Sequence, residues 1–410
     1  MEQTIFYVII GIVVFDFLFE RVLDLLNSSR ISPELPEDLK GIYDQEKYKQ
    51  SQNYLKANLR FSMISSTFMF LVILAMLFFK GFAFASQVVT GMTSNNYLQS
   101  LLFFGLLAVG SELISLPFQW HSTFVIEERF GFNKTTIKTF LLDKLKSWIL
   151  GIILGGGILL FIQWAFQKGG SLFWLIALLG IASFIIFMTM FYTSVILPLF
   201  NKLTPLGEGA LKDSIEDFAS KAGFVLSNIY IMDGSKRSTK ANAFFSGLGP
   251  KKKIILYDTL VHELETEEIV AVLAHEIGHY KKRHIYKGLV FSLLQIALMF
   301  FLLWWALNNP VFSQSLGASS NRFYMGLLAF GLLYSPVSFL LGIGMNISSR
   351  KHEYQADAYA TSYRYGKQLI QALIKLSVSS LSNLKPHPAY VFFHYSHPTL
   401  LQRKKAIEEL

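Results

Sequence analysis

Seven long apolar blocks constrain the fold of this chain more than any other feature of its sequence. Crossing the hydrocarbon core of a bilayer takes about 20 apolar residues in a helix, and each block is close to that length or longer. Charged residues make up 16% of the chain, against about 25% in a soluble domain. We therefore predict a mainly α-helical, polytopic membrane protein with seven transmembrane helices. The blocks are Thr4–Leu26, Phe61–Phe84, Leu98–Trp120, Ser147–Phe166, Leu172–Phe200, Tyr286–Leu307 and Tyr324–Ile347.

The segments between the blocks alternate between basic and base-poor. Lys and Arg are frequent in 27–60, 121–146 and 201–285 and again from Arg350, but scarce in 81–99 and 308–323. The positive-inside rule then puts the N-terminus outside and the C-terminus in the cytoplasm. The net charge of +9 is divided among loops, which indicates contact with membrane lipids and argues against nucleic acid as a partner. Without cysteine, any metal must be held by His and carboxylate side chains.

A His-Glu-x-x-His motif, His275-Glu-Ile-Gly-His279, lies inside a helical pattern that begins near Thr266, the expected N-cap. Histidines four residues apart lie on one face of a helix, so both imidazoles can reach one metal ion. Glu276 can reach a water molecule at that metal without being a ligand. This is the position of the general base in a zinc hydrolase.

The motif falls in the larger of two segments that lie outside the apolar blocks. Its residues 228–232, 241–245 and 253–257 are strand-like, and Gly247–Pro250 predicts a hairpin turn between the last two. We expect a small α/β zinc-metalloprotease domain built from this fifth-to-sixth span loop and the C-terminal tail. The predicted divisions are 1–200 (transmembrane helices 1–5), 201–285 (metalloprotease segment), 286–347 (transmembrane helices 6 and 7) and 348–410 (tail completing the zinc site).

Two histidines leave a catalytic zinc short of one protein ligand. Glu353, just past the seventh block and on the same side as the motif, is the strongest candidate. Asp357 follows one turn later and can accept the second N–H of a ligating imidazole. His352 is the rival ligand, although its side chain should point about a third of a turn away from Glu353. The alternative for this whole segment is a solvated helix face after a membrane span.

Taken together, these motifs resemble the zinc site of the type I CAAX prenyl proteases, which are seven-helix integral membrane metalloproteases. Further stretches carry the same resemblance and extend it from about Phe118 to Arg403. They are Phe124–Asn133, Pro198–Leu206, Lys240–Gly247 and Ser396–Thr399. The compact length and short tail are similar to a bacterial member of that family.

The resemblance implies roles only at matching positions. His275, His279 and Glu353 would bind one Zn²⁺ ion, Glu276 would activate water, and Asp357 would orient a histidine ligand. His397 would stabilise the developing oxyanion. The implied substrate-binding residues are Asn242, Ala243 and Phe244 on a sheet edge, where an extended peptide can add as a strand, and Arg403 near the zinc.

The resemblance therefore implies a zinc endopeptidase that cleaves near the C-terminus of CAAX-type peptides or proteins, which can be prenylated. We expect it to act as a monomer. One alternative is a general quality-control protease of the HtpX type, which needs fewer spans. Another is a zinc-binding transporter or receptor, which would place its ligands at mid-membrane or fill the fourth position with protein.

Overall fold

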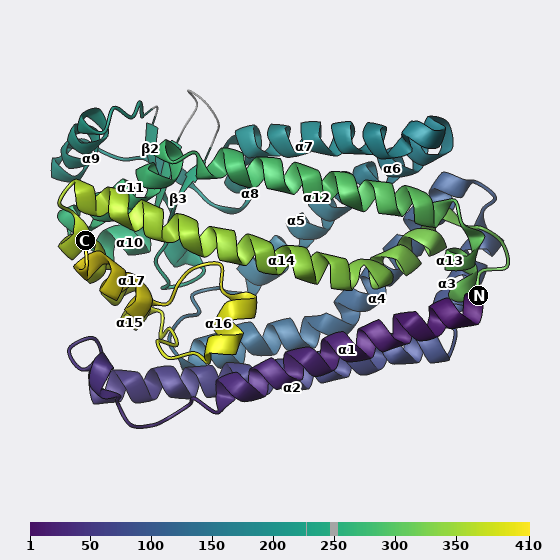
Figure 1. The fold of residues 1–410 in the computed structure, drawn as a ribbon, viewed down its shortest axis with the longest axis horizontal. Helices are drawn as coiled ribbons and strands as arrows, with labels where there is room; N and C mark the ends of the chain where they lie inside the picture. Colours follow the sequence, from purple (N-terminus) through teal and green to yellow (C-terminus); the bar gives the residue numbers. More distant parts are fainter. Residues whose placement is uncertain (227, 247–252) are drawn as a thin grey trace.

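A computed structural model describes residues 1–226, 228–246 and 253–410. Long helices lie side by side along one axis of the molecule, and a small sheet with shorter helices lies at one end (Figure 1). The N-terminus is at the opposite end from the sheet. The chain is mainly helical, as predicted.

The helices of the elongated part are α1 (Glu2–Ser28), α2 (Gln45–Phe78), α3 (Gly81–Met92), α4 (Asn96–His121), α5 (Ile137–Leu150), α6 (Gly156–Gly169), α7 (Phe173–Val195), α8 (Leu197–Phe200), α12 (His284–Leu307), α13 (Pro310–Ser315) and α14 (Phe323–Ser362). A π-helical stretch, Ser122–Glu127, continues α4, and another, Gly151–Gly155, joins α5 to α6.

Five helical segments of the described chain are long and apolar enough to cross a membrane. They are Gln45–Phe78, Asn96–Glu127, Ile137–Phe200, His284–Leu307 and Phe323–Ser362. Only 6–17% of the residues in their apolar windows are buried within the protein. Apolar side chains left outside in such numbers need a lipid environment, so the chain is an integral membrane protein.

Five segments correspond to six of the seven predicted spans. The run Ile137–Phe200 contains both the fourth and the fifth, because the chain turns back at Gly170, whose φ of 52° lies in the left-handed region. In Figure 1, α6 and α7 meet at this turn. The first predicted span, Thr4–Leu26, forms helix α1 but is not among the five segments.

The remaining elements form an α/β unit at one end of the long helices. Its strands are β1 (Leu203–Pro205), β2 (Asn228–Met232), β3 (Ala243–Ser246) and β4 (Lys253–Tyr257). Its helices are α9 (Ala210–Lys221), α10 (Asp258–Glu263), α11 (Thr266–Lys281), α15 (Gly366–Ser379) and α17 (Leu400–Glu408). Helix α16 (Pro388–His394) packs instead on α1 and α14. The predicted hairpin turn at 247–250 lies outside the described residues.

The sheet has the order β1-β2-β4-β3, so β3 is an edge strand. β2 and β4 run parallel, and β3 pairs antiparallel with β4, with Ala243 opposite Leu256. Apolar residues of α9, β4, α11, α14 and α15 form one core, which includes Phe218, Leu256, Ile277, Ala360 and Leu369. This core fixes α11 between the sheet and the end of α14.

Helix α14 is a single helix of 40 residues that joins the elongated part to the α/β unit. The predicted seventh span and the predicted tail helix are both parts of it, and the predicted boundary at 347/348 falls in its interior. In Figure 1 it runs along the molecule and ends beside α11. Its last three turns therefore bring residues from the far end of the sequence to the motif helix.

Candidate metal centre

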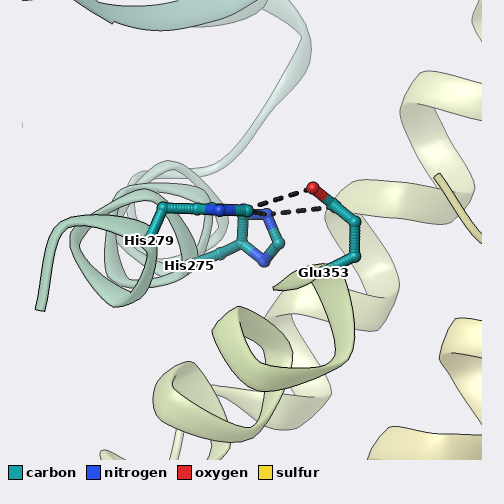
Figure 2. Close-up of side chains that lie close together, drawn as sticks. All are labelled: His275, His279 and Glu353. Carbon is teal, nitrogen blue, oxygen red and sulfur yellow. Dashed lines mark hydrogen bonds and ion pairs between the residues drawn. The ribbon is translucent and has the colours of Figure 1, made fainter. Parts of the chain in front are cut away.

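Helix α11 carries the His-Glu-x-x-His motif on a well-capped scaffold. Glu265 is the N-cap, and its side chain and that of Glu268 form a reciprocal capping box, which satisfies two backbone N–H groups that a helix start leaves without partners. Thr266, the predicted N-cap, is the first helical residue. His275 and His279 lie one turn apart and face the same neighbour, α14 (Figure 2).

Glu353 on α14 meets both imidazoles. Its carboxylate oxygens lie 3.5 Å from His275 Nε2 and 3.2 Å from His279 Nε2, and the two Nε2 atoms are 3.2 Å apart. Figure 2 shows these three side chains converging from the two helices. They are the three residues whose ligand atoms lie close enough together to hold one metal ion in the described part of the chain.

The spacing of these donor atoms fits a zinc ion. At Zn–N and Zn–O distances of about 2.0–2.1 Å and tetrahedral angles, neighbouring ligand atoms stand about 3.3 Å apart. The two Nε2 atoms are 3.2 Å apart, and each lies 3.2–3.5 Å from one of the two Glu353 oxygens. Glu353 Oε2 is buried and makes no hydrogen bond, although His275 Nε2 and the Arg403 guanidinium each lie 3.5 Å from it, so this oxygen can still accept a metal ion. Two imidazoles and one carboxylate also match a catalytic zinc site, in which the fourth position stays open.

Behind His275, two further residues hold the imidazole in place. Its Nδ1 lies 2.8 Å from Asp357 Oδ1. Arg403 on α17 donates to both oxygens of Asp357, at 2.6 and 2.9 Å, and lies 3.5 Å from Glu353. Asp357 is 1% and Arg403 8% exposed. The tail therefore closes the centre from outside, and Arg403 is buried against Asp357.

The electrostatic environment of His275 favours positive charge. Burial lowers its pKa, but the hydrogen bonds with Asp357 and Glu353 outweigh burial and raise the pKa to about 9. A site that stabilises an imidazolium so strongly is also one that attracts a metal cation, which competes with the proton for the same nitrogen.

His279 is held from its other side by a histidine that the sequence analysis did not choose. Its Nδ1 lies 3.0 Å from Nδ1 of His284, and His284 Nε2 lies 2.8 Å from Gln355 Oε1. His352, the rival third ligand, stacks on His284 with ring centroids 3.9 Å apart and is outside the donor group. The only sequence signal for this contact was the position of His284, which follows His279 by five residues.

The predicted catalytic side chains Glu276 and His397 lie on the accessible side of the centre. Glu276 is partly exposed and makes no hydrogen bond or ion pair with the described residues. His397 Nε2 lies 3.3 Å from Glu353 Oε1, and its side chain is 62% exposed. Both side chains can therefore meet a molecule that enters from outside.

The predicted substrate-binding residues Asn242, Ala243 and Phe244 lie at and before the edge strand β3. The carbonyl of Asn242 accepts from the backbone N–H of Tyr257 at 3.0 Å, and its Oδ1 accepts from the N–H of Ala243. Ala243 and Phe244 line an apolar void of about 10 Å³ together with Glu276, which is room for about one water molecule. The other lining residues are Ile215, Ile254, Leu256, Leu260, Ile269, Val272 and Leu273.

A polar network that the sequence analysis missed anchors the chain just before β3. Lys240 Nζ donates to Tyr54 Oη and to Glu127 Oε2, both at 2.9 Å, and Tyr54 donates to the same carboxylate. Lys240 also lies 4.4 Å from the centre of the Phe132 ring. Two helices of the elongated part thus hold the edge strand in position.

A histidine-histidine-glutamate centre on a small α/β unit, carried by apolar membrane helices, defines a membrane-embedded metalloprotease. Residues 25–202 match the family model described as CAAX prenyl protease N-terminal, five membrane helices, and residues 205–410 match that of peptidase family M48. The chain belongs to the M48 peptidase family.

Individual relatives agree over almost the whole chain. The chain is 37% identical to CAAX prenyl protease 1 of Saccharomyces cerevisiae, over 98% of this chain and 94% of that protein. It is 36% identical to a CAAX prenyl protease 1 homolog of Arabidopsis thaliana, over 98% and 96%. The crystal structure of S. mikatae Ste24p superposes with a TM-score of 0.94 at 36% identity, covering 98% of this chain and 99% of that one.

Proposed function

We propose that this protein is a zinc endopeptidase that cleaves peptide bonds near the C-terminus of CAAX-type peptides or proteins. The observation that carries the proposal is the donor group of His275, His279 and Glu353. The two Nε2 atoms are 3.2 Å apart and lie 3.5 and 3.2 Å from Glu353 Oε2 and Oε1, respectively. The substrate class rests on similarity to proteins named CAAX prenyl protease 1, at up to 37% identity over nearly the full chain.

Glu276 acts as the general base in this proposal. Zinc held by the three ligands would supply a Lewis acid that polarises the scissile carbonyl and makes water more acidic. Glu276 takes the proton of the attacking water and delivers it to the leaving amine. Its lack of a competing partner among the described residues keeps its carboxylate available for both steps.

Asp357 and Arg403 act on His275 and not on substrate. Asp357 accepts the Nδ1 proton of His275, so Nε2 is left free to bind the metal. The two hydrogen bonds from Arg403 fix the Asp357 carboxylate in turn. Since Arg403 is 8% exposed, we assign it a positioning role in place of the substrate contact implied by resemblance.

His397 is the proposed donor to the oxyanion of the tetrahedral intermediate. Its imidazole is largely exposed, yet its Nε2 lies 3.3 Å from a ligand atom of Glu353. A donor in that position can approach a carbonyl oxygen that binds at the open side of the centre, where the negative charge develops during attack.

The edge strand β3 is the proposed platform for the substrate backbone. Its free edge can pair with an extended peptide, and Asn242 at its start offers a side-chain amide. A small apolar void beside Ala243 and Phe244 includes Glu276 in its lining, so a peptide paired with β3 would lie next to the proposed general base.

We also propose that the chain has seven transmembrane helices, of which α1 is the first. Its N-terminus would lie outside the cell and its zinc site in the cytoplasm. Support comes from the basic segments on one side and from the helical conformation of Glu2–Ser28. We expect a monomer, because the three donor residues and their supporting groups all come from one chain.

The test is cleavage of matched farnesylated and unprenylated CAAX peptides by the purified protein, with Glu276→Ala as control. Cleavage that requires both the lipid and Glu276 supports a prenyl-directed endopeptidase. Equal cleavage of both peptides favours the alternative, a general membrane peptidase without prenyl requirement. Cleavage of neither, by zinc-loaded protein, would overturn the CAAX assignment.

A further inference from the structure

A cationic groove that the proteolytic mechanism does not use lies between α2 and the π-helical end of α4. Its volume is about 460 Å³. One face of α2 provides Lys56 and Arg60, and the residues around the π-helical stretch provide His121 and Arg129. The other lining residues are Asn53, Ala57, Phe61, Ile64, Val125, Ile126 and Phe130, so no carboxylate lines the groove.

The cations of this groove are not neutralised within the described chain. Lys56, Arg60 and Arg129 are exposed, and none has a carboxylate within ion-pair distance. The two acidic residues that precede Arg129 in the sequence have other partners, because Glu127 binds Lys240 and Tyr54 and Glu128 accepts from Asn133. Three positive charges around one concave site create a potential that attracts an anion.

The groove also has an apolar side that continues along the membrane helices. Phe61 stacks on His121 with ring centroids 5.0 Å apart, and Ile64 and Val125 are 64% and 47% exposed. Phe61 begins the second predicted apolar block, and Trp120 ends the third. The cations thus stand at the level where the apolar surface ends and the polar surface begins.

We propose that this groove binds the phosphate headgroup of an anionic phospholipid. Arg60 and Arg129 offer planar guanidinium groups that suit phosphate oxygens, and Lys56 adds a point charge. The exposed apolar side chains give the acyl chains a surface beside the headgroup. Basic pockets between membrane helices bind anionic headgroups in this way. Soluble phosphate esters share the headgroup chemistry but not the acyl chains.

The test measures lipid adducts on the full-length protein in neutral detergent by native mass spectrometry. The probes are dioleoyl phosphatidic acid, dioleoyl phosphatidylcholine and glycerol 3-phosphate. We expect phosphatidic acid to bind the wild type with the highest affinity. Lys56→Gln/Arg60→Gln/Arg129→Gln should weaken that binding at least about tenfold, and Arg60→Gln alone several-fold.

A matched control variant removes three positive charges, as the first triple variant does, but at positions that do not line the groove. Lys49, Lys134 and Lys138 are exposed and have no ion-pair partner among the described residues. Their triple substitution by Gln should leave phosphatidic acid binding within about twofold of the wild type. Zinc content and peptide cleavage, which the groove does not serve, report whether each variant is folded.

Four results would overturn the assignment. They are equal binding of phosphatidic acid and phosphatidylcholine, an equal loss in the control triple, displacement of phosphatidic acid by glycerol 3-phosphate at similar concentration, and displacement by a CAAX peptide with a free carboxylate but not by its amide. The third would indicate a site for soluble anions, and the fourth a subsite for the substrate terminus.

Discussion

Gly278 of α11 lies directly against Ala356 of α14. A Cβ atom placed on Gly278 would be 3.1 Å from the Ala356 Cα and 3.2 Å from its carbonyl oxygen. Both neighbours are backbone atoms of a helix and cannot rotate away. The distance between the two helices, and hence between Glu353 and the two histidines, therefore depends on the missing side chain at residue 278.

Gly278→Ala should force α11 and α14 apart and so move Glu353 away from His275 and His279. We expect a loss of about 1–3 kcal/mol in stability from overpacking, together with lower zinc content. Metal analysis and thermal unfolding in detergent measure both. Gly288→Ala on α12 is the matched control, because a Cβ there meets nothing within 4 Å. Wild-type zinc content in Gly278→Ala would refute the spacing argument.

Glu276→Gln should abolish most turnover but leave the metal bound. Removing a general base typically costs about 10²–10⁴-fold in rate, and Glu276 is not one of the three donor residues. Single-turnover cleavage and metal analysis on the same sample separate the two effects. Near-normal activity with a full zinc complement would exclude Glu276 as the base.

Glu353→Ala should lower metal occupancy, because two histidines alone leave the site without its only carboxylate ligand. Activity should fall in parallel and recover partly at high zinc concentration, as expected for weakened binding. Equilibrium dialysis against a competing chelator gives the affinity. Unchanged zinc content would assign the third ligand to another residue. His352→Ala is the control, since His352 stacks on His284 and is outside the donor group.

Arg403→Met should destabilise the protein by about 3–5 kcal/mol, because it leaves the buried carboxylate of Asp357 without its cation. Adding Asp357→Asn should restore part of that stability. Zinc affinity should stay reduced in the double variant by about 10–100-fold, since His275 has lost its carboxylate partner. If Arg403 instead contacted substrate, Arg403→Met would raise KM and leave stability unchanged.

Lys240→Met should raise KM several-fold with little change in zinc content. It breaks the two hydrogen bonds that anchor the chain before β3, so the edge strand is less well placed to receive a peptide. Lys236→Met is the charge-matched control, because Lys236 is exposed on the preceding loop. A similar KM in both variants would show that the anchor has no effect on substrate binding.

Sequence patterns were sufficient for the features that reside in single elements. Hydropathy and length predicted membrane helices, and β-branched residues predicted the strands at 228–232 and 253–257. The four-residue spacing of His275 and His279 predicted that both would face one neighbour. The count of seven spans stays a prediction, because α1 is helical but is not among the five membrane-spanning segments.

Contacts between distant segments were beyond such reasoning. Lys240 makes hydrogen bonds with Tyr54 and Glu127, which precede it in the sequence by 186 and 113 positions, respectively. The periodicity within one helix carries no information about such distant partners. His284 is not among the predicted site residues. Its contact with His279 depends on the left-handed turn at Arg283, φ 58°, which joins α11 to α12.

The metal centre is built from residues between 275 and 403 in the sequence. The carboxylate of Asp357, which supports His275, is held by the guanidinium of Arg403 on α17. During synthesis the chain must therefore be translated as far as Arg403 before the centre can close. By then α12 and all of α14, which lie between the motif and Arg403 in the sequence, have already been made. A chain that ends before Arg403 would thus carry the motif but no complete centre, so we expect proteolytic activity only after translation has passed Arg403.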